Sequence, residues 1–170
     1  MKVNKQTVKK WAKEIASTAL IVFVIANAIS FFKAPDIKDK NLPNLSTMLI
    51  NQKVFSTKES KGKPLLIHFW ATWCPTCKLE AGNIQTLSES YEVITIAVKS
   101  GENGDISSYL NEHNFDFKVI NDKQGILAQR FKVPAFPTTF IYNKEGKLSF
   151  TEVGYTSTFS LYLRMWFANQ

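Results

Sequence analysis

Two cysteines have the most distinctive chemistry in this chain, and they are the only cysteines among its 170 residues. They lie in the stretch Trp73-Cys74-Pro75-Thr76-Cys77, so that two residues separate the thiols. This spacing lets both thiols lie on the first turn of a helix, where free N–H groups and the helix dipole stabilise a thiolate. Because a lowered thiol pKa makes a cysteine reactive at neutral pH, the motif predicts thiol–disulfide exchange, with Cys74 attacking and Cys77 resolving.

Other uses of the two cysteines have less support in the sequence. A structural zinc site needs about four Cys or His ligands. The chain offers only His68 and His113 besides the cysteines, without the usual paired histidine spacing. A purely structural disulfide would close so short a loop that it removes little entropy from the unfolded chain. The alternative function that stays open is a copper or zinc carrier, because soft thiolates favour Cu(I).

The N-terminal segment predicts a membrane anchor. Residues 15–32 carry no charge and reach the lower limit of length for a helix that spans a bilayer, about 17 residues. Residues 1–14 hold five lysines and one glutamate, which is +4 of the net charge of +7. Positive charge on that side keeps the N-terminus cytoplasmic. A cleaved signal peptide is the alternative, since residues 26–28 fit a cleavage pattern, but the apolar run continues past them.

With either reading of the N-terminus, the cysteines lie outside the cytoplasm. We expect a single-pass protein of a bacterial inner membrane, with its folded domain in the periplasm or outside. Residues 33–44 are polar, contain Pro35 and Pro43, and are typical of a linker, which leaves 45–170 for the domain. No basic cluster is interleaved with aromatic residues, which disfavours nucleic-acid binding.

The order of apolar runs and amphipathic stretches predicts an α/β fold with a mixed central sheet and helices on both faces. We expect strands at 65–70, 93–98, 119–120, 138–142 and 148–151, and a hairpin of 48–50 with 54–56. We expect helices at 78–91, 105–113, 125–131 and 157–168. The cysteine motif follows the strand at 65–70, and sites of open α/β sheets lie at the carboxyl ends of such strands.

Hydrophobic spacing also predicts the inner faces of two of these helices. The residues expected to face the core from the first helix are Leu79, Ile84, Leu87 and Tyr91. Those expected to share one face of the last helix are Phe159, Leu163 and Phe167. For the helix at 105–113, Asp105 is the expected N-cap.

Two stretches resemble a known family. The sequence Phe-Trp-Ala-Thr-Trp-Cys-Pro-Thr-Cys at 69–77 resembles the active-site strand and turn of thioredoxin-like proteins of the TlpA/ResA type. Phe-Pro-Thr-Thr-Phe at 136–140 resembles the cis-proline loop of that family. Residues 97–104 and 119–122 resemble a narrower group, the membrane-anchored oxidoreductases similar to the suppressor-of-copper-sensitivity protein ScsD. The likeness covers about 45–168 and implies a thioredoxin-like fold and a protein disulfide oxidoreductase that needs no cofactor or metal.

The resemblance also implies roles for two residues outside the cysteine motif. Pro137 is expected to be cis and to face the cysteines, so that the neighbouring backbone can pair with an incoming peptide. Glu80 is expected to lie near the buried sulfur and to take the proton of Cys77 when a mixed disulfide resolves. Such proteins often carry a proline two residues after that glutamate, whereas this chain has Gly82.

The aromatic residues around the motif divide into two groups. Trp73 is expected to shield Cys74 and, with Phe136, to contact the substrate. Trp70 and His68, within the apolar strand, are expected to be core residues. The implied partners are protein thiols or disulfides and a membrane redox partner, and the sequence leaves both reduction and oxidation of the substrate open.

Overall fold

The computed structural model describes residues 39–170 continuously and, before them, residues 11, 13–15, 17–18, 21, 25 and 35. The chain divides into two units, Met1–Lys33 and Ala34–Gln170. Most of the predicted anchor at 15–32 and of the basic segment at 1–14 lies outside the described residues. Among the residues that are described, no helix is both long enough and apolar enough to cross a membrane.

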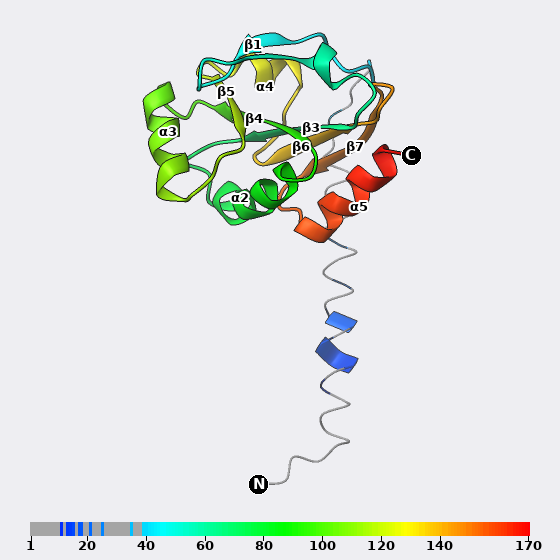
Figure 1. Cartoon of the computed structure of the whole chain (residues 1–170). Helices are drawn as coiled ribbons and strands as arrows, with labels where there is room; N and C mark the ends of the chain where they lie inside the picture. Colours follow the sequence, from blue (N-terminus) through cyan, green and yellow to red (C-terminus); the bar gives the residue numbers. More distant parts are fainter. Residues whose placement is uncertain are drawn as a thin grey trace. The chain divides into compact units, whose positions relative to one another are not determined.

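A five-stranded mixed sheet is the centre of the folded unit (Figure 1). Its strands are β3 (Leu65–Trp70), β4 (Glu92–Val98), β5 (Lys118–Asp122), β6 (Thr138–Tyr142) and β7 (Leu148–Val153). They lie in the order β5-β4-β3-β6-β7, with β3, β4 and β5 parallel and β6 antiparallel to both of its neighbours. The prediction of a mixed α/β sheet is confirmed, and β3 and β6 have the predicted bounds.

Side chains alternate between two buried faces along the central strand β3. Leu65, Ile67 and Phe69 belong to one apolar cluster, whereas Leu66 and Trp70 belong to the other. We call the second side the cysteine face; α2 (Pro75–Ser88), α3 (Asn103–Glu112) and α5 (Thr158–Ala168) cover it. We call the first side the hairpin face; α4 (Ile126–Arg130) and strands β1 (Ser46–Met48) and β2 (Val54–Ser56) cover it.

The first residues of the folded unit are held by backbone pairing. The Leu42 N–H donates to the Gly146 carbonyl at 2.7 Å, and the Leu148 N–H donates to the Lys40 carbonyl at 2.7 Å. Residues 40–42, inside the segment for which we predict a linker, thus lie against the turn between β6 and β7. The predicted hairpin is present, but its first strand ends at Met48, where we expected it to begin. A 3-10 helix, η1 (Thr57–Ser60), follows β2.

Two helices differ from their expected ranges. α2 starts at Pro75 instead of Lys78, which places the cysteine motif on its first turn as the cysteine spacing predicts, and it runs through Gly82 as one element to Ser88. α3 has Glu102 as its N-cap instead of Asp105, because Asp105 occupies the third helical position and accepts the Glu102 N–H at 2.7 Å. This reciprocal arrangement is a capping box, in which the cap and the third residue satisfy each other's backbone donors.

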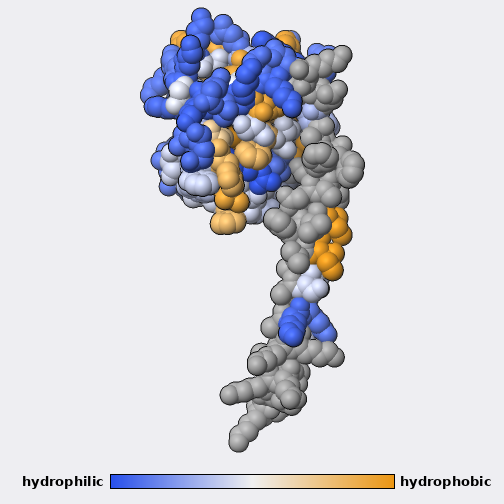
Figure 2. Space-filling view, turned by 90° about the vertical axis from the view of Figure 1, so that its right-hand side faces the viewer, coloured by the Kyte–Doolittle hydropathy of each residue, from blue (hydrophilic) through white to orange (hydrophobic). Residues whose placement is uncertain are grey.

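The predicted inner faces are wrong in part. Leu79 is 75% exposed, although Ile84 and Leu87 are fully buried as expected. In α5 the face with Phe159, Leu163 and Phe167 points outward, and the buried residues of α5 are Leu161, Met165 and Ala168. Apolar side chains are visible among hydrophilic ones on the surface seen in Figure 2. Because α5 is apolar on both sides, its periodicity did not identify the buried face.

Candidate active site

The two cysteines lie at the N-terminus of α2, where β3 ends. Cys74 is the N-cap, Pro75 occupies the first turn, and the Cys77 N–H points at the Cys74 sulfur at 3.2 Å. Proline suits this position because it supplies no N–H and its fixed φ is already helical. A disulfide joins Cys74 to Cys77, whose Cα atoms are 5.3 Å apart. The helix N-terminus therefore directs its partial positive charge at the sulfur of Cys74.

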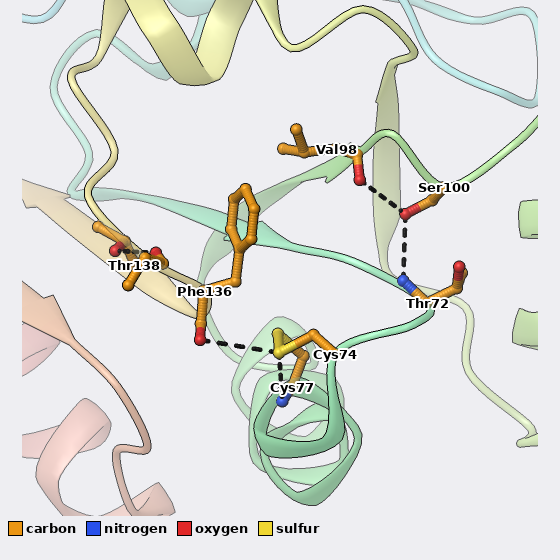
Figure 3. Close-up of a disulfide and its surroundings, with 8 residues drawn as sticks. Thr72, Cys74, Cys77, Val98, Ser100, Phe136 and Thr138 are labelled. Atoms are coloured by element: carbon orange, nitrogen blue, oxygen red, sulfur yellow. Dashed lines mark hydrogen bonds between the residues drawn. A yellow bond between two sulfur atoms is a disulfide. The ribbon is translucent and has the colours of Figure 1, made fainter.

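The loop before β6 faces this sulfur. The Phe136–Pro137 peptide bond is cis, as predicted. The Phe136 carbonyl oxygen lies 3.7 Å from the Cys74 sulfur, a contact visible in Figure 3. A disulfide sulfur carries no hydrogen, so this contact becomes a hydrogen bond only when Cys74 is a thiol. The Pro137 carbonyl accepts the Gly154 N–H at 2.9 Å, which attaches the loop to the end of β7.

Two aromatic rings flank Cys74. Trp73 is 57% exposed, and its ring meets that of Phe136 edge to face with centroids 5.8 Å apart. The Trp73 indole N–H donates to the Lys99 carbonyl at 3.0 Å, which fixes the orientation of the ring. Cys74 itself is only 5% exposed and Cys77 only 2%. The rings therefore form an apolar rim beside a nearly covered disulfide.

Ser100 supports the site, and the sequence did not point to it. It follows β4, and its hydroxyl accepts the Thr72 N–H at 3.1 Å and donates to the Val98 carbonyl at 3.1 Å (Figure 3). It thus holds the backbone two residues before Cys74. The available signal was topological, because parallel neighbours β3 and β4 end at the same edge of the sheet, so their following residues meet there.

Glu80 lies one helical turn after Cys77 on the buried side of α2. It is 0% exposed, and neither carboxyl oxygen has a hydrogen-bond partner within the described part of the chain. Burial raises the pKa of Glu80 to about 8, and the negative charge of Glu152 contributes in the same direction. The nearby Thr156 N–H offsets a part of this rise without completing a hydrogen bond. Glu80 can therefore exchange a proton close to neutral pH.

Neither histidine forms a metal-binding group with the cysteines in the described part of the chain. His68 is a core residue, as predicted, and its Nδ1 lies 2.9 Å from the Thr139 hydroxyl across β3 and β6. Burial lowers the pKa of His68 to about 3, so its ring is neutral at physiological pH. His113 Nδ1 bonds to the Tyr109 carbonyl at 2.8 Å in α3. Between residues 39 and 170, no group of three or more His, Cys, Asp or Glu side chains could hold a metal ion.

The fold thus brings five of the six predicted site residues to one edge of the sheet, namely Cys74, Cys77, Trp73, Phe136 and Pro137. The sixth, Glu80, lies behind them on the buried face of α2. Trp70 is buried, as predicted for a core residue, and its indole N–H has no partner in the described part of the chain.

This geometry can be compared with known proteins. The Redoxin family model matches residues 32–164. The chain belongs to the Redoxin family. A thioredoxin-like protein of Haemophilus influenzae is 30% identical to this Redoxin chain over 163 residues, covering 95% of the chain and 96% of the relative. The thiol-disulfide oxidoreductase ResA of Oceanobacillus iheyensis is 26% identical over 164 residues, covering 86% of the chain and 84% of the relative.

A solved structure has the same fold. The crystal structure of a thiol:disulfide interchange protein of the thioredoxin family from Chlorobium tepidum matches with a TM-score of 0.68 at 22% identity. The match covers 79% of this chain and 99% of that structure. The fold is therefore thioredoxin-like. With a bridged cysteine pair at its helix N-terminus, this Redoxin chain is a thiol–disulfide oxidoreductase.

Proposed function

We propose that this protein exchanges disulfides with protein substrates outside the cytoplasm, anchored in the membrane by residues 15–32. The observation that carries the exchange chemistry is the Cys74–Cys77 disulfide at the start of α2, faced by the cis Phe136–Pro137 loop. The uncharged run and the lysines before it support the anchor and the orientation. The similarity of residues 97–104 and 119–122 to ScsD-like proteins supports placing the protein in that narrower group of membrane-anchored oxidoreductases.

The exchange proceeds in two steps when the protein starts reduced. The Cys74 thiolate attacks one sulfur of a substrate disulfide, so that a Cys74–substrate bond forms and the other substrate sulfur leaves as a thiolate. The Cys77 sulfur then attacks Cys74, which forms the Cys74–Cys77 disulfide and releases the second substrate thiolate. The protein loses two electrons and the substrate gains them. The same steps in reverse oxidise a substrate dithiol.

Glu80 acts in the second step of this scheme. Cys77 is a better nucleophile as a thiolate, and its proton passes to the Glu80 carboxylate one turn away. A carboxyl with a pKa of about 8 is mostly protonated at pH 7 and gains carboxylate as the pH rises. We expect the resolving step to accelerate up to about pH 8. Phe136 and Pro137 supply the backbone beside which a substrate strand lies, and Trp73 supplies an apolar contact.

Trapping of the mixed disulfide tests this proposal. In a Cys77→Ser variant, the first step still occurs but the second cannot, so covalent adducts with substrate proteins accumulate and are visible on non-reducing gels. Cys74→Ser and the double variant are matched controls and form no adduct. If the Cys77→Ser variant also lacks adducts, the two-step scheme is wrong. Stoichiometric copper or zinc in the reduced wild-type protein would instead support the metal-carrier alternative.

The location is tested with a membrane-impermeant maleimide on intact, reduced cells. Labelling of Cys74 in a Cys77→Ser strain without permeabilisation is the expected result. Labelling only after permeabilisation would place the domain in the cytoplasm and contradict the proposed orientation, while leaving the exchange chemistry intact.

A further inference from the structure

Glu80 belongs to a buried seam between α2, β7 and α5. Cys77, Glu80 and Asn83 follow one another at intervals of three residues and so share one side of α2. The Asn83 amide donates to the Thr156 carbonyl at 2.9 Å and accepts the Thr158 hydroxyl at 2.8 Å. These two hydrogen bonds fix the Glu80 side of α2 against the segment that leads from β7 into α5.

An ion pair lies on the other side of this seam. Glu152, in β7, is paired in register with Thr139, which contacts His68. Phe150, two residues earlier in β7, packs against the cluster of the cysteine face, so Glu152 points to that same face. Arg164, in α5, binds Glu152 with Nε and Oε1 2.6 Å apart.

The ion pair is largely shielded from water. The Glu152 and Arg164 side chains are only 13% and 17% exposed. The guanidinium of Arg164 also lies over the Phe150 ring, 5.9 Å from its centroid, and bonds to Ser160. Charges in such a place act on their neighbours through a medium of low polarity, and salt screens them weakly.

The other groups that face Glu80 do not compete with this pair near neutral pH. On β3, His68 is neutral because burial lowers its pKa to about 3, and on β6 the facing side chain is the uncharged Thr139. Tyr155 and Tyr162 contact α2 through their hydroxyls: the Asn83 amide donates to the Tyr155 hydroxyl at 3.3 Å, and the Tyr162 hydroxyl donates to the Thr86 carbonyl at 3.2 Å. Glu152 is the charged group whose field reaches Glu80, and Arg164 balances that charge.

We propose that the Glu152–Arg164 ion pair controls when Glu80 can take the proton of Cys77, and so sets the pH range in which the mixed disulfide resolves. The inference rests on the proposed exchange function and on the role of Glu80 in it. Glu152 and Arg164 are positioning residues, because they act on Cys77 only through Glu80. An unbalanced negative charge at Glu152 keeps the proton on Glu80, whereas an unbalanced positive charge at Arg164 releases it.

Two substitutions make opposite changes in this field. Glu152→Gln removes the negative charge, keeps the size of the side chain and leaves Arg164 positive. Arg164→Gln removes the positive charge that binds Glu152 and keeps the Glu152 charge. We expect the midpoint of the pH profile of resolution to fall by about one pH unit in the first variant and to rise by about one in the second. Arg164→Lys keeps the charge and is the matched control, with a midpoint near that of the wild type.

The resolving step can be followed alone with 4,4′-dithiodipyridine and the full chain, reduced and held in mild detergent. Attack by Cys74 releases the first thiopyridone and leaves Cys74 in a mixed disulfide with the other thiopyridine. Attack by Cys77 on the Cys74 sulfur then releases the second thiopyridone and forms the Cys74–Cys77 disulfide. The rate of the second release between pH 5 and 10 is the measured quantity. Cys77→Ser releases only the first equivalent and defines the background. Carbon-13 NMR of the Glu80 carboxyl, assigned with Glu80→Gln, gives its titration independently of the kinetics.

Opposite displacements of the kinetic midpoint and of the Glu80 titration in the two variants support the proposal. Displacements in the same direction, or none, overturn it, because a merely structural ion pair would slow both variants without moving their midpoints oppositely. The Glu80→Gln variant separates the two levels of inference. If its second release keeps the wild-type pH profile, the proposed role of Glu80 fails. If Glu80→Gln loses the wild-type pH profile but Glu152→Gln keeps it, the role of Glu80 stands and only the proposed role of the ion pair fails.

Discussion

The two faces of the central sheet are built from the same strands but have different chemistry. On the hairpin face the interior is apolar at its centre, where Phe69 contacts Phe131 and Phe140 with ring centroids 5.1 and 5.8 Å away. On the cysteine face, the fully or almost fully buried residues include two ionisable side chains, His68 of β3 and Glu80 of α2. Both groups are buried, and burial displaces the pKa of each toward its neutral form.

This difference shows on which face of the sheet the ionisable groups near the site reduce the stability of the fold. Buried ionisable groups cost free energy unless they are neutral or paired. Glu80 and His68 lie under α2, the helix that carries the cysteines, whereas the centre of the hairpin face around Phe69 is packed by apolar side chains. We therefore expect mutations at this apolar centre to change stability equally at every pH, and mutations of Glu80 and His68 to change how stability depends on pH.

The largest effect is expected from Phe69→Ala on the hairpin face. Phe69 is fully buried, and its truncation leaves a cavity that costs about 3–5 kcal/mol of unfolding free energy. Urea denaturation of the full chain in mild detergent at pH 5 and pH 8.5 measures this loss, which should be the same at both values. A loss that differs by more than about 1 kcal/mol between them would show that the hairpin face is coupled to the titrating groups.

The next effect concerns Glu80, whose pKa is about 8 in the folded protein against an ordinary value of 4.5. The folded state therefore holds this proton more tightly than the unfolded state, and stability falls as the pH rises from about 4.5 to about 8. Each pKa unit corresponds to about 1.4 kcal/mol, and relaxation around the charge reduces the total, so we expect about 3 kcal/mol.

Glu80→Gln removes this dependence. Relative to the wild type, the unfolding free energy of the variant should rise by about 3 kcal/mol between pH 5 and pH 8.5. The buried amide has its own cost, which does not depend on pH and cancels in this comparison. Denaturation of both proteins at the two pH values gives the difference. Parallel stability profiles of wild type and variant would mean that Glu80 does not titrate in this range.

The smallest of the three effects is at His68 and has the opposite sign. Its pKa falls from 6.5 to about 3 on folding, so the unfolded state binds the proton first and wild-type stability decreases as the pH drops below 6.5. His68→Gln removes that loss. The loss of unfolding free energy that this substitution causes should therefore be smaller at pH 4.5 than at pH 7, by about 2 kcal/mol.

Thermal and urea denaturation at pH 4.5 and pH 7 test the prediction for His68. Loss of the contact with Thr139 adds about 1 kcal/mol at both pH values and cancels in the comparison. An equal cost at both pH values would contradict the assignment of His68 as a buried neutral ring.

The strands were predictable because a continuous apolar run between turns has few alternatives. Leu65–Trp70 and Thr138–Tyr142 have the expected bounds. Helix faces were less predictable. Leu79 and Phe159 were expected to be buried in the periodic pattern and are instead 75% and 77% exposed. A helix that is apolar on more than one side can bury any of its apolar faces, and only the neighbouring elements decide which face is buried.

Within the site, local spacing was sufficient for some residues and insufficient for others. An interval of three residues puts Glu80 on the same side of α2 as Cys77, but its complete burial depends on β7 and α5 closing over it. Ser100 lies 26 residues after Cys74 in the chain and supports the motif only because parallel strands end at one edge. No local pattern marks either outcome.

The sequence alone determined the two sulfurs, their separation and the helix start that holds them, because a Cys-Pro-x-Cys run sets its own backbone conformation through bonds between near neighbours. Tertiary structure decided what surrounds them: the carbonyl of Phe136 beside Cys74, the buried carboxyl of Glu80, and the ion pair of Glu152 with Arg164. These contacts join residues far apart in the chain, and their burial and charge balance exist only after the sheet and helices have packed.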